Sequence, residues 1–191
     1  MRSVVSIGNS GDGWVLTPAL QLHGKWSSKR SFSRTVMPAN PDFKDLFSIL
    51  NAECVEYLVV GAHAVIHYTE PRYTKDLDLW INPTPDNAER AMLALRRFGA
   101  PLANIVPTDF QNPELIYQIG VAPNRIDVLM GIAGLDFPLA WAQRVTTTYD
   151  GIPIHILSLE TLRKAKLASG RPQDLLDLKR LDEDHPPSDM T

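Results

Sequence analysis

Apolar and polar residues follow one another along the chain in blocks that predict separate helices and strands. Apolar side chains at helical spacing predict a helix over residues 42–55, with Asp42 as its N-cap. Residues 56–61 form a short apolar run that ends in glycine, which is typical of a buried strand. We expect a helix to follow at residues 62–69 and a second strand at 76–81.

The rest of the pattern is equally regular. Residues 84–100 predict a helix, because Thr84 precedes Pro85 in the first turn and Gly99 follows the last. Further strands are expected at 114–120, at 124–130 and on both sides of a turn at Asp150–Gly151, and further helices at 138–144, 158–169 and 172–181. The order of these elements is not a regular βαβ repeat. It predicts a mixed α/β (α+β) domain with a central mixed sheet, flanking helices and C-terminal helices.

The two ends of the chain differ from this pattern. Residues 1–36 are rich in Ser, Gly and basic side chains and have no sustained period. We interpret them as a disordered or loosely attached arm, which arises from a mis-assigned upstream start codon or touches RNA. The domain is expected to cover residues 37–184, and the polar residues 185–191 are expected to form a flexible tail.

Composition narrows the classes of partner. The formal net charge of −3 provides no bulk attraction to nucleic acid or to anionic lipid. One cysteine, Cys54, excludes an internal disulfide and suits a reducing cytoplasm, and its place in the first helical pattern predicts a buried small side chain. No apolar run approaches the roughly 18 residues that a membrane helix needs, so no membrane partner is expected.

Two aspartates lie on one face of the strand at residues 76–81. Asp76 and Asp78 are two residues apart and point the same way, where their repulsion at 5 Å is on the order of 3 kcal/mol. A divalent cation would reverse that sign, and Mg²⁺ prefers carboxylates, waters and phosphates. Asp127 is expected on a neighbouring strand facing the same site, so that three carboxylates could hold one or two Mg²⁺ ions.

A plainer interpretation of the pair is the solvent-facing side of an amphipathic strand. Leu77 and Leu79 clearly form the core side, but Trp80 continues the aspartate face and is not polar. A metal-dependent phosphohydrolase is a further alternative, but it would need histidines near the aspartates, and His155 lies in an apolar hairpin.

Candidate phosphate-binding residues precede the aspartates. Gly61 and Ala62 lie between a strand and a helix, where backbone N–H groups can approach a triphosphate. Arg72 is suited to a phosphate or a carboxylate, and Thr74 to orienting the entry of the strand. Each also has an ordinary structural interpretation, as a turn glycine, a surface ion pair or a cap. His63 is interpreted as a further donor or as a packed residue.

Together these motifs resemble the DNA polymerase β-like nucleotidyltransferase superfamily. The stretch "YLVVGAHAVIHYTEPRYTKDLDLWI" is similar to its small bacterial members, the abortive-infection toxin-type (AbiEii-like) and minimal nucleotidyltransferases. The likeness continues through "RIDVLMGI" to "ILSLETLRKAKLASGRPQDLLDLKRL" and covers about residues 40–182. It departs from the pattern at Ala62, where the family usually has Gly or Ser. A backbone N–H remains there, but a serine hydroxyl does not.

The resemblance implies roles for particular residues. It implies that Asp76 and Asp78 bind Mg²⁺, that Asp127 completes the catalytic site, and that Gly61 lies against nucleotide phosphates. Residues further along the chain that it implies in nucleotide binding are Lys166, Arg171 and Asp174. Physically, Lys166 is a mobile point charge, Arg171 is a fork for phosphate or base, and Asp174 could orient either. The ordinary interpretation of these three is helix capping.

The resemblance also implies an activity. We expect Mg²⁺-dependent transfer of a nucleoside monophosphate from a nucleoside triphosphate to an acceptor, in the cytoplasm. A tRNA end, a partner protein or a small molecule are all open as acceptors, and a cognate toxin or antitoxin is a possible partner. The alternative is a non-catalytic nucleotide- or partner-binding module, such as an antitoxin or regulator.

Overall fold

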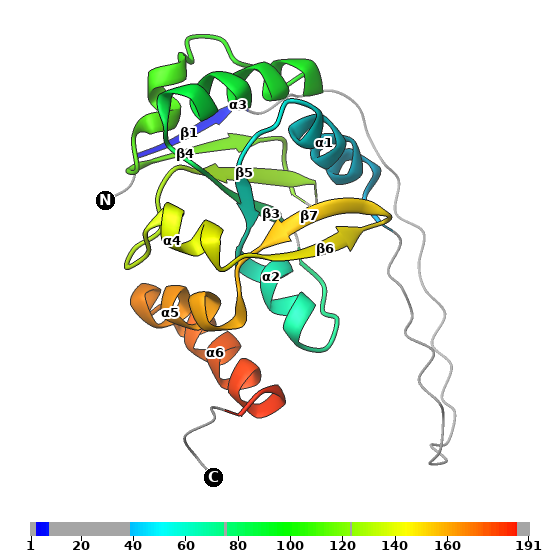
Figure 1. The fold of residues 1–191 in the computed structure, drawn as a ribbon, viewed down its shortest axis with the longest axis vertical. Coiled ribbons are helices and arrows are strands. Elements are labelled where there is room, and N and C mark those ends of the chain that lie inside the picture. Colours follow the sequence, from blue (N-terminus) through cyan, green and yellow to red (C-terminus); the bar gives the residue numbers. More distant parts are fainter. Residues whose placement is uncertain (1–2, 8–38, 75, 123, 187–191) are drawn as a thin grey trace.

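The central feature of the fold is one mixed sheet of seven strands. A computed structural model describes residues 3–7, 39–74, 76–122 and 124–186. The strands lie side by side in the order β1-β4-β5-β3-β2-β7-β6 (Figure 1). Their bounds are Ser3–Ile7 (β1), Tyr57–Val59 (β2), Asp76–Ile81 (β3), Leu115–Ile119 (β4), Arg125–Leu129 (β5), Val145–Tyr149 (β6) and Ile152–Ile156 (β7).

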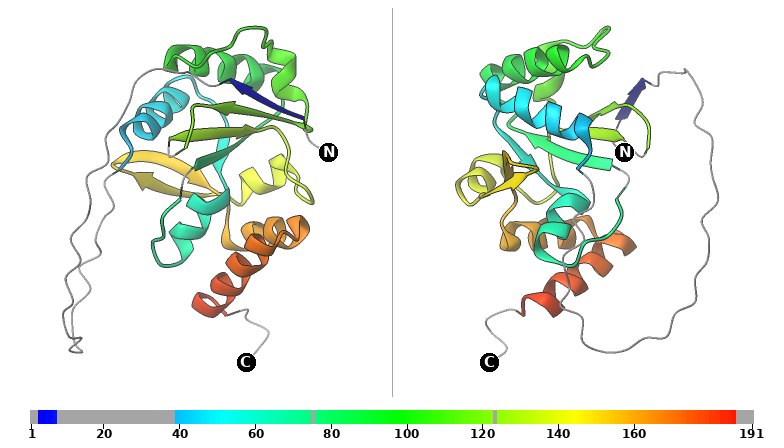
Figure 2. Two further views of the ribbon diagram at one scale, coloured as in Figure 1. Left: turned by 180° about the vertical axis from the view of Figure 1, so that it is seen from behind. Right: turned by 90° about the vertical axis from the view of Figure 1, so that its right-hand side faces the viewer.

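Helices cover both faces of this sheet. Their bounds are Pro41–Ala52 (α1), Gly61–Tyr68 (α2), Pro85–Phe98 (α3), Phe137–Ala142 (α4), Leu159–Ser169 (α5) and Pro172–Asp184 (α6), with a short 3-10 helix, η1, at Pro107–Gln111. One buried cluster joins α1 and α3 to the face of Leu77 and Leu79. A second joins α2, α4, α5 and α6 to the face of Trp80. Figure 2 shows α5 and α6 together at one end of the molecule, away from α1 and α3. The predicted fold class is confirmed.

The face that carries the two aspartates is therefore not a solvent-facing strand surface. Trp80 follows Asp76 and Asp78 on that face and is buried against Phe137 of α4. Leu77 and Leu79 point the other way, into the larger cluster. Because helices cover the aspartate face, the carboxylates lie in a partly enclosed site.

Helix ends follow the local sequence signals to within a few residues. The N-cap of α1 is Asn40, whose side chain accepts a hydrogen bond from the Asp42 N–H, and Pro41 occupies the first turn. Asp42 is therefore not the N-cap, although its position suggested that it was. Pro41 suits the first helical turn, so the helix begins closer to the N-terminus. Ser158 caps α5, and Gly170 closes that helix with φ of 60°.

Two elements depart from the sequence-based expectation. Regular structure was not expected before residue 37, but residues 3–7 pair in parallel with β4. The apolar letters Val4, Val5 and Ile7 are a strand signal that the Gly- and Ser-rich segment after them obscures. The other element is η1, which no periodicity announced. Residues 1–2 and 8–36 of the predicted arm and 187–191 of the predicted tail lie outside the described residues.

Cys54 is a further departure. Its thiol is exposed, not buried. Helix α1 ends at Ala52, and Cys54 adopts a positive φ of 53° in the turn that follows, so the helical pattern no longer sets its direction. In the part of the chain that the structure describes, no helix has the length and apolar character needed to cross a bilayer.

Candidate functional site

The three predicted aspartates meet on neighbouring strands. In the parallel pairing of β3 with β5, Asp78 lies opposite Asp127, and Asp76 lies opposite Arg125. Paired strands are about 4.8 Å apart, so side chains at one level of the sheet are close neighbours. The sheet thus places Asp76, Asp78 and Asp127 on one face, as the alternation of the two strands predicted.

A fourth charged side chain, Arg125, lies among them. Its Nε donates to Asp127 Oδ1 at 2.9 Å and its Nη2 to Asp127 Oδ2 at 3.0 Å. The same Nη2 also donates to Asp76 Oδ2. The guanidinium therefore bridges two of the three carboxylates and offsets part of their repulsion.

Asp78 receives less compensation. Burial, followed by the charges of Asp76 and Asp127, raises the pKa of Asp78 to about 6. Burial also raises the pKa of Asp127, although the hydrogen bond from Arg125 opposes it. The site therefore has an excess of negative potential centred on Asp78, which a bound cation would relieve.

Gly61 makes room for the Asp78 carboxylate. It has a φ of 57°, and a Cβ atom built on it would lie 1.9 Å from Asp78 Oδ2. Any larger residue would collide with that oxygen and would also be strained at this φ. The glycine between β2 and α2 is thus required by an aspartate 17 positions later, whatever its role toward phosphates.

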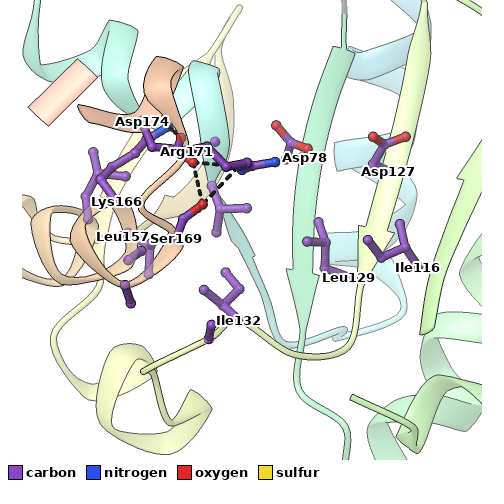
Figure 3. A pocket seen from close by; sticks show the side chains of 16 residues that line it. Asp78, Ile116, Asp127, Leu129, Ile132, Leu157, Lys166, Ser169, Arg171 and Asp174 are labelled. Atoms are coloured by element: carbon purple, nitrogen blue, oxygen red, sulfur yellow. Dashed lines mark hydrogen bonds and ion pairs between the residues drawn. The ribbon is translucent and has the colours of Figure 1, made fainter. Parts of the chain in front are cut away.

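A cavity of about 440 Å³ opens beside these groups. Asp78, Asp127 and Gly61 line one side, and Lys166, Arg171 and Asp174 line the other. Figure 3 shows the two aspartates next to each other on adjacent strands, with Arg171 extending toward Asp78 from the turn between α5 and α6. Negative charge on one wall thus faces positive charge on the other.

The positive wall is held by a buried ionic network. Lys166 is 7% exposed, and its Nζ contacts Asp174 Oδ1 at 2.7 Å and Asp177 Oδ2 at 3.0 Å. Arg171 Nε donates to Asp174 Oδ2 at 2.7 Å. Burial alone would raise the pKa of Asp174, but hydrogen bonds from Lys166, Ser169 and Arg171 outweigh it and hold this pKa at about 2. Asp174 thus contacts both cations.

Arg72 and Thr74 lie away from the cavity wall. Arg72 Nη2 forks onto Asp177, at 3.0 Å from Oδ1 and 3.1 Å from Oδ2, so its partner is a carboxylate of this chain. Thr74 Oγ1 lies 3.3 Å from the Asp76 carbonyl oxygen, at the entry of β3. The described residues that line the cavity do not include Arg72, Thr74, Ala62 or Asp76.

His63 is a packed residue. Its ring meets those of Phe43 and Tyr149 edge to face, and burial lowers its pKa. The same contacts turn it toward α1 and β6. It is not among the described residues that line the cavity.

Mg²⁺ fits part of this donor set. Asp78 and Asp127 are paired carboxylates under excess negative potential, which is the chemistry that Mg²⁺ prefers. Toward Asp76 and Asp127, however, the guanidinium of Arg125 takes the place of a metal cation. Within the described residues, no group of three or more His, Cys, Asp or Glu side chains is arranged to hold a metal ion. Binding of Mg²⁺ by all three aspartates, and a two-metal site above all, stays a prediction.

Comparison with known proteins gives a likeness to solved structures only. No protein-family model and no curated protein sequence matches this chain. Among solved structures, it is similar to the lincomycin-bound crystal structure of the lincosamide antibiotic adenylyltransferase LnuA, with a TM-score of 0.48 and 13% identity. The match covers 75% of this chain and 96% of that chain. A likeness at this level assigns no family and no activity, so the superfamily resemblance stays a prediction.

Two important residues were missed from the sequence. Arg125 stands two positions before Asp127, and strand alternation alone puts both on one face. Asp177 is 1% exposed and receives hydrogen bonds from Arg72, Lys166 and Gln173. Its signal was its position three residues after Asp174, on the same side of a helix.

Proposed function

We propose that this protein is a nucleotidyltransferase that moves a nucleoside monophosphate from a nucleoside triphosphate to an acceptor. The observation that carries the proposal is the cavity of about 440 Å³ with Asp78 and Asp127 on one wall and Lys166 and Arg171 on the other. Its size is within the roughly 300–1,000 Å³ of ligand pockets. A triphosphate with its cation has the complementary distribution of charge.

Lys166 and Arg171 are the residues that would bind the phosphates. An ammonium group has three N–H donors, and Asp174 and Asp177 occupy two of those of Lys166, which leaves one for a phosphate oxygen. Arg171 is 77% exposed and contacts Asp174 and Ser169 through Nε alone, so its terminal nitrogens can bind an anion. Asp174 and Asp177 fix the direction of both cations.

Asp78 and Asp127, with Asp76, are the residues that would hold Mg²⁺, whose charge would offset that of the triphosphate when bound. An acceptor hydroxyl oxygen then attacks the α-phosphorus. A new P–O bond forms, the bond from the α-phosphorus to the bridging oxygen breaks, and pyrophosphate leaves with that electron pair. Asp127 takes the hydroxyl proton. Since the groups are fixed beforehand by the sheet and by the ionic network, positioning and charge supply most of the rate.

The proposals for the acceptor and for the biological setting rest on the sequence resemblance. A tRNA end or a partner protein would place this chain among toxin–antitoxin pairs, in the cytoplasm, as the resemblance implied. When a nucleotide is bound, Gly61 and the backbone N–H of Ala62 would approach its phosphates. Arg72 and Thr74 would support the site from outside the cavity.

Transfer of labelled nucleotide tests the proposal. Purified protein is incubated with each of the four α-labelled nucleoside triphosphates, Mg²⁺ and candidate acceptors. We expect incorporation that requires Mg²⁺ and that falls at least about a hundredfold in Asp76→Asn or Asp78→Asn, since each removes charge from the reaction centre. Undiminished transfer in the double variant would refute the assignment of these residues.

One observation favours a second function, a nucleotide- or partner-binding module without catalysis. Arg125 already satisfies Asp76 and Asp127, so the carboxylates can be read as a closed structural cluster. In that case a nucleoside triphosphate would bind equally well with and without Mg²⁺, or would not bind at all. Calorimetry in Mg²⁺ and in EDTA separates the two functions.

A further inference from the structure

A second cavity, of about 480 Å³, lies where β3 and β5 end. Trp80, Asn82 and Thr84 line it from the end of β3 and the segment after it, and Ile132 and Phe137 line it from the segment between β5 and α4. None of the residues assigned above to nucleotide binding or catalysis lines it.

The charge of this second cavity is negative. Among the described residues that line it, the charged ones are Glu114 and Asp136, and none is basic. Glu114 is exposed, and Asp136 uses Oδ1 to cap α4 by accepting from the Leu139 N–H at 3.1 Å. Most of the other lining is apolar or aromatic. A ligand for this surface has an apolar body and a positive charge.

Two of the residues that line the cavity carry hydrogen-bond donors, Trp80 and Thr84. Trp80 is 2% exposed, and its indole Nε1 has no partner among the described residues. A buried donor without a partner costs roughly 1–3 kcal/mol, so a ligand that supplies an acceptor would gain at this position. Thr84 stands at the N-cap of α3 without a side-chain hydrogen bond to that helix.

The second cavity adjoins the first. Ile132 and Ala133 line both. Trp80 lies two residues beyond Asp78 on the same strand and the same face, which corresponds to about 6.6 Å along β3. A molecule in the second cavity can therefore reach the place where Asp78 and Asp127 face the first.

We propose that the second cavity binds the acceptor, and that the acceptor is a small organic cation with an apolar body and a hydrogen-bond acceptor. This inference rests on the proposed nucleotidyltransferase function and chooses the small molecule among the three kinds of acceptor that the sequence leaves open. A tRNA would bring phosphates against Glu114 and Asp136 without a basic lining residue to receive them. A protonated amine meets two carboxylates and an aromatic wall.

A matched pair of probes tests the ligand class without nucleotide or Mg²⁺. 4-Methoxybenzylamine and 4-methoxybenzoate share an apolar ring and an ether oxygen but have opposite charges. The full-length protein, labelled with ¹⁵N, has four tryptophans, and Trp80→Phe identifies the Trp80 indole signal. We expect the amine to shift that signal saturably, and the benzoate to leave it in place.

Variants of the two charged lining residues, here called the rim, test the role of charge. Glu114→Gln combined with Asp136→Asn should raise the Kd of the amine at least about fivefold, and Asn still caps a helix. The control pair, Asp45→Asn with Glu70→Gln, changes exposed residues that do not line the cavity and should leave the Kd unchanged. Equal shifts from both probes, no shift from the amine, or an unchanged Kd in the rim variant would each overturn the proposal. Displacement of the amine by an oligoribonucleotide would also overturn it.

The two proposals fail separately. If the amine binds but no nucleoside triphosphate does, the nucleotidyltransferase function and the acceptor role are wrong, and the ligand class of the cavity stands. If a nucleoside triphosphate binds in Mg²⁺ but the amine does not bind, the function stands and the acceptor class is wrong.

Discussion

At the scale of single residues, the guanidinium of Arg125 changes how the paired aspartates are understood. From the sequence, the like charges on one strand face predicted a bound cation. In this chain, an arginine on the neighbouring strand provides part of the positive charge. Arg125 compensates Asp76 and Asp127, and Asp78 remains with a raised pKa. The position that would accept Mg²⁺ is thus the one nearest Asp78.

Arg125→Met should increase the effect of Mg²⁺ on stability, because in the proposed site the guanidinium and the metal would compete for the same carboxylates. We expect a lower Tm than wild type in EDTA, and a rise in Tm on adding Mg²⁺ that is larger by several degrees, which corresponds to about 1 kcal/mol. Thermal denaturation followed by circular dichroism measures both. Arg97→Met, which removes an exposed partner of Glu53, is the control. A response to Mg²⁺ no larger than that of wild type would contradict the competition.

Asp78→Asn should stabilise the metal-free protein at neutral pH. The pKa of Asp78 is about 6 in the folded protein against an ordinary value of 3.8, so the folded state binds the extra proton between about pH 4 and pH 6. Stability from this group is therefore lost as the pH rises through that window. The variant removes the loss, which is worth about 2–3 kcal/mol at pH 7.5 and nearly nothing at pH 4. Urea denaturation in EDTA at both pH values measures it, with Asp45→Asn as the exposed control. A variant that is less stable than wild type at pH 7.5 would contradict the raised pKa.

The candidate residues were predictable to different degrees. Asp76, Asp78 and Asp127 follow from strand alternation, since a period of two fixes which side chains share a face. The reason for Gly61 was not predictable, because its contact with Asp78 depends on how α2 lies over the sheet. From the sequence, a phosphate and a carboxylate were equally suitable partners for Arg72. Its partner is Asp177 because of how α6 packs, which the sequence does not show.

At the scale of elements, Asp177 ties three segments together. It receives hydrogen bonds from Arg72 before β3, Lys166 in α5 and Gln173 in α6. The direction of Lys166 into the first cavity thus depends on a side chain that does not line it. Asp177 therefore couples the stability of the fold to the proposed binding of phosphate by Lys166.

Asp177→Asn should therefore be costly. Removing one charge from a buried ionic network leaves the other charges unpaired, and we expect a loss of about 3 kcal/mol in the free energy of unfolding. Asp182→Asn is the matched control, because it removes a half-exposed partner of Arg163 on the same helix and should cost less than about 1 kcal/mol. Urea denaturation at pH 7 compares the two. Equal losses would show that burial of Asp177 adds nothing.

Element types and order were largely predictable, and boundaries less so. The predicted succession from the first helix to the last agrees with α1 to α6 and β2 to β7. Glycines with positive φ, such as Gly99 and Gly170, closed helices where expected. The predicted start of α1 was two residues too late, because Asn40 is the N-cap and Pro41 occupies the first turn. The element η1 has no periodic pattern to detect.

At the scale of the whole molecule, the order of strands brings the two halves of the chain into one site. β3 lies between β5 and β2, and β2 pairs with β7, which leads into α5. The carboxylates of β3 and β5 therefore face the cations of α5 and the turn after it (Figure 3). This convergence depends on strand order, which periodicity along the chain does not contain. The position of β1 on the far side of β4 was unpredictable for the same reason.

The proposed function requires Mg²⁺ and a triphosphate to bind together between the aspartates and Lys166. Calorimetric titration of each nucleoside triphosphate into the full-length protein, in Mg²⁺ and in EDTA, tests this directly. At least one nucleoside triphosphate should bind in Mg²⁺, bind at least about tenfold more weakly in EDTA, and lose binding in the Asp78→Asn and Asp127→Asn double variant. Binding that is indifferent to Mg²⁺ and to the double variant, or no binding by any of the four nucleotides, would contradict it.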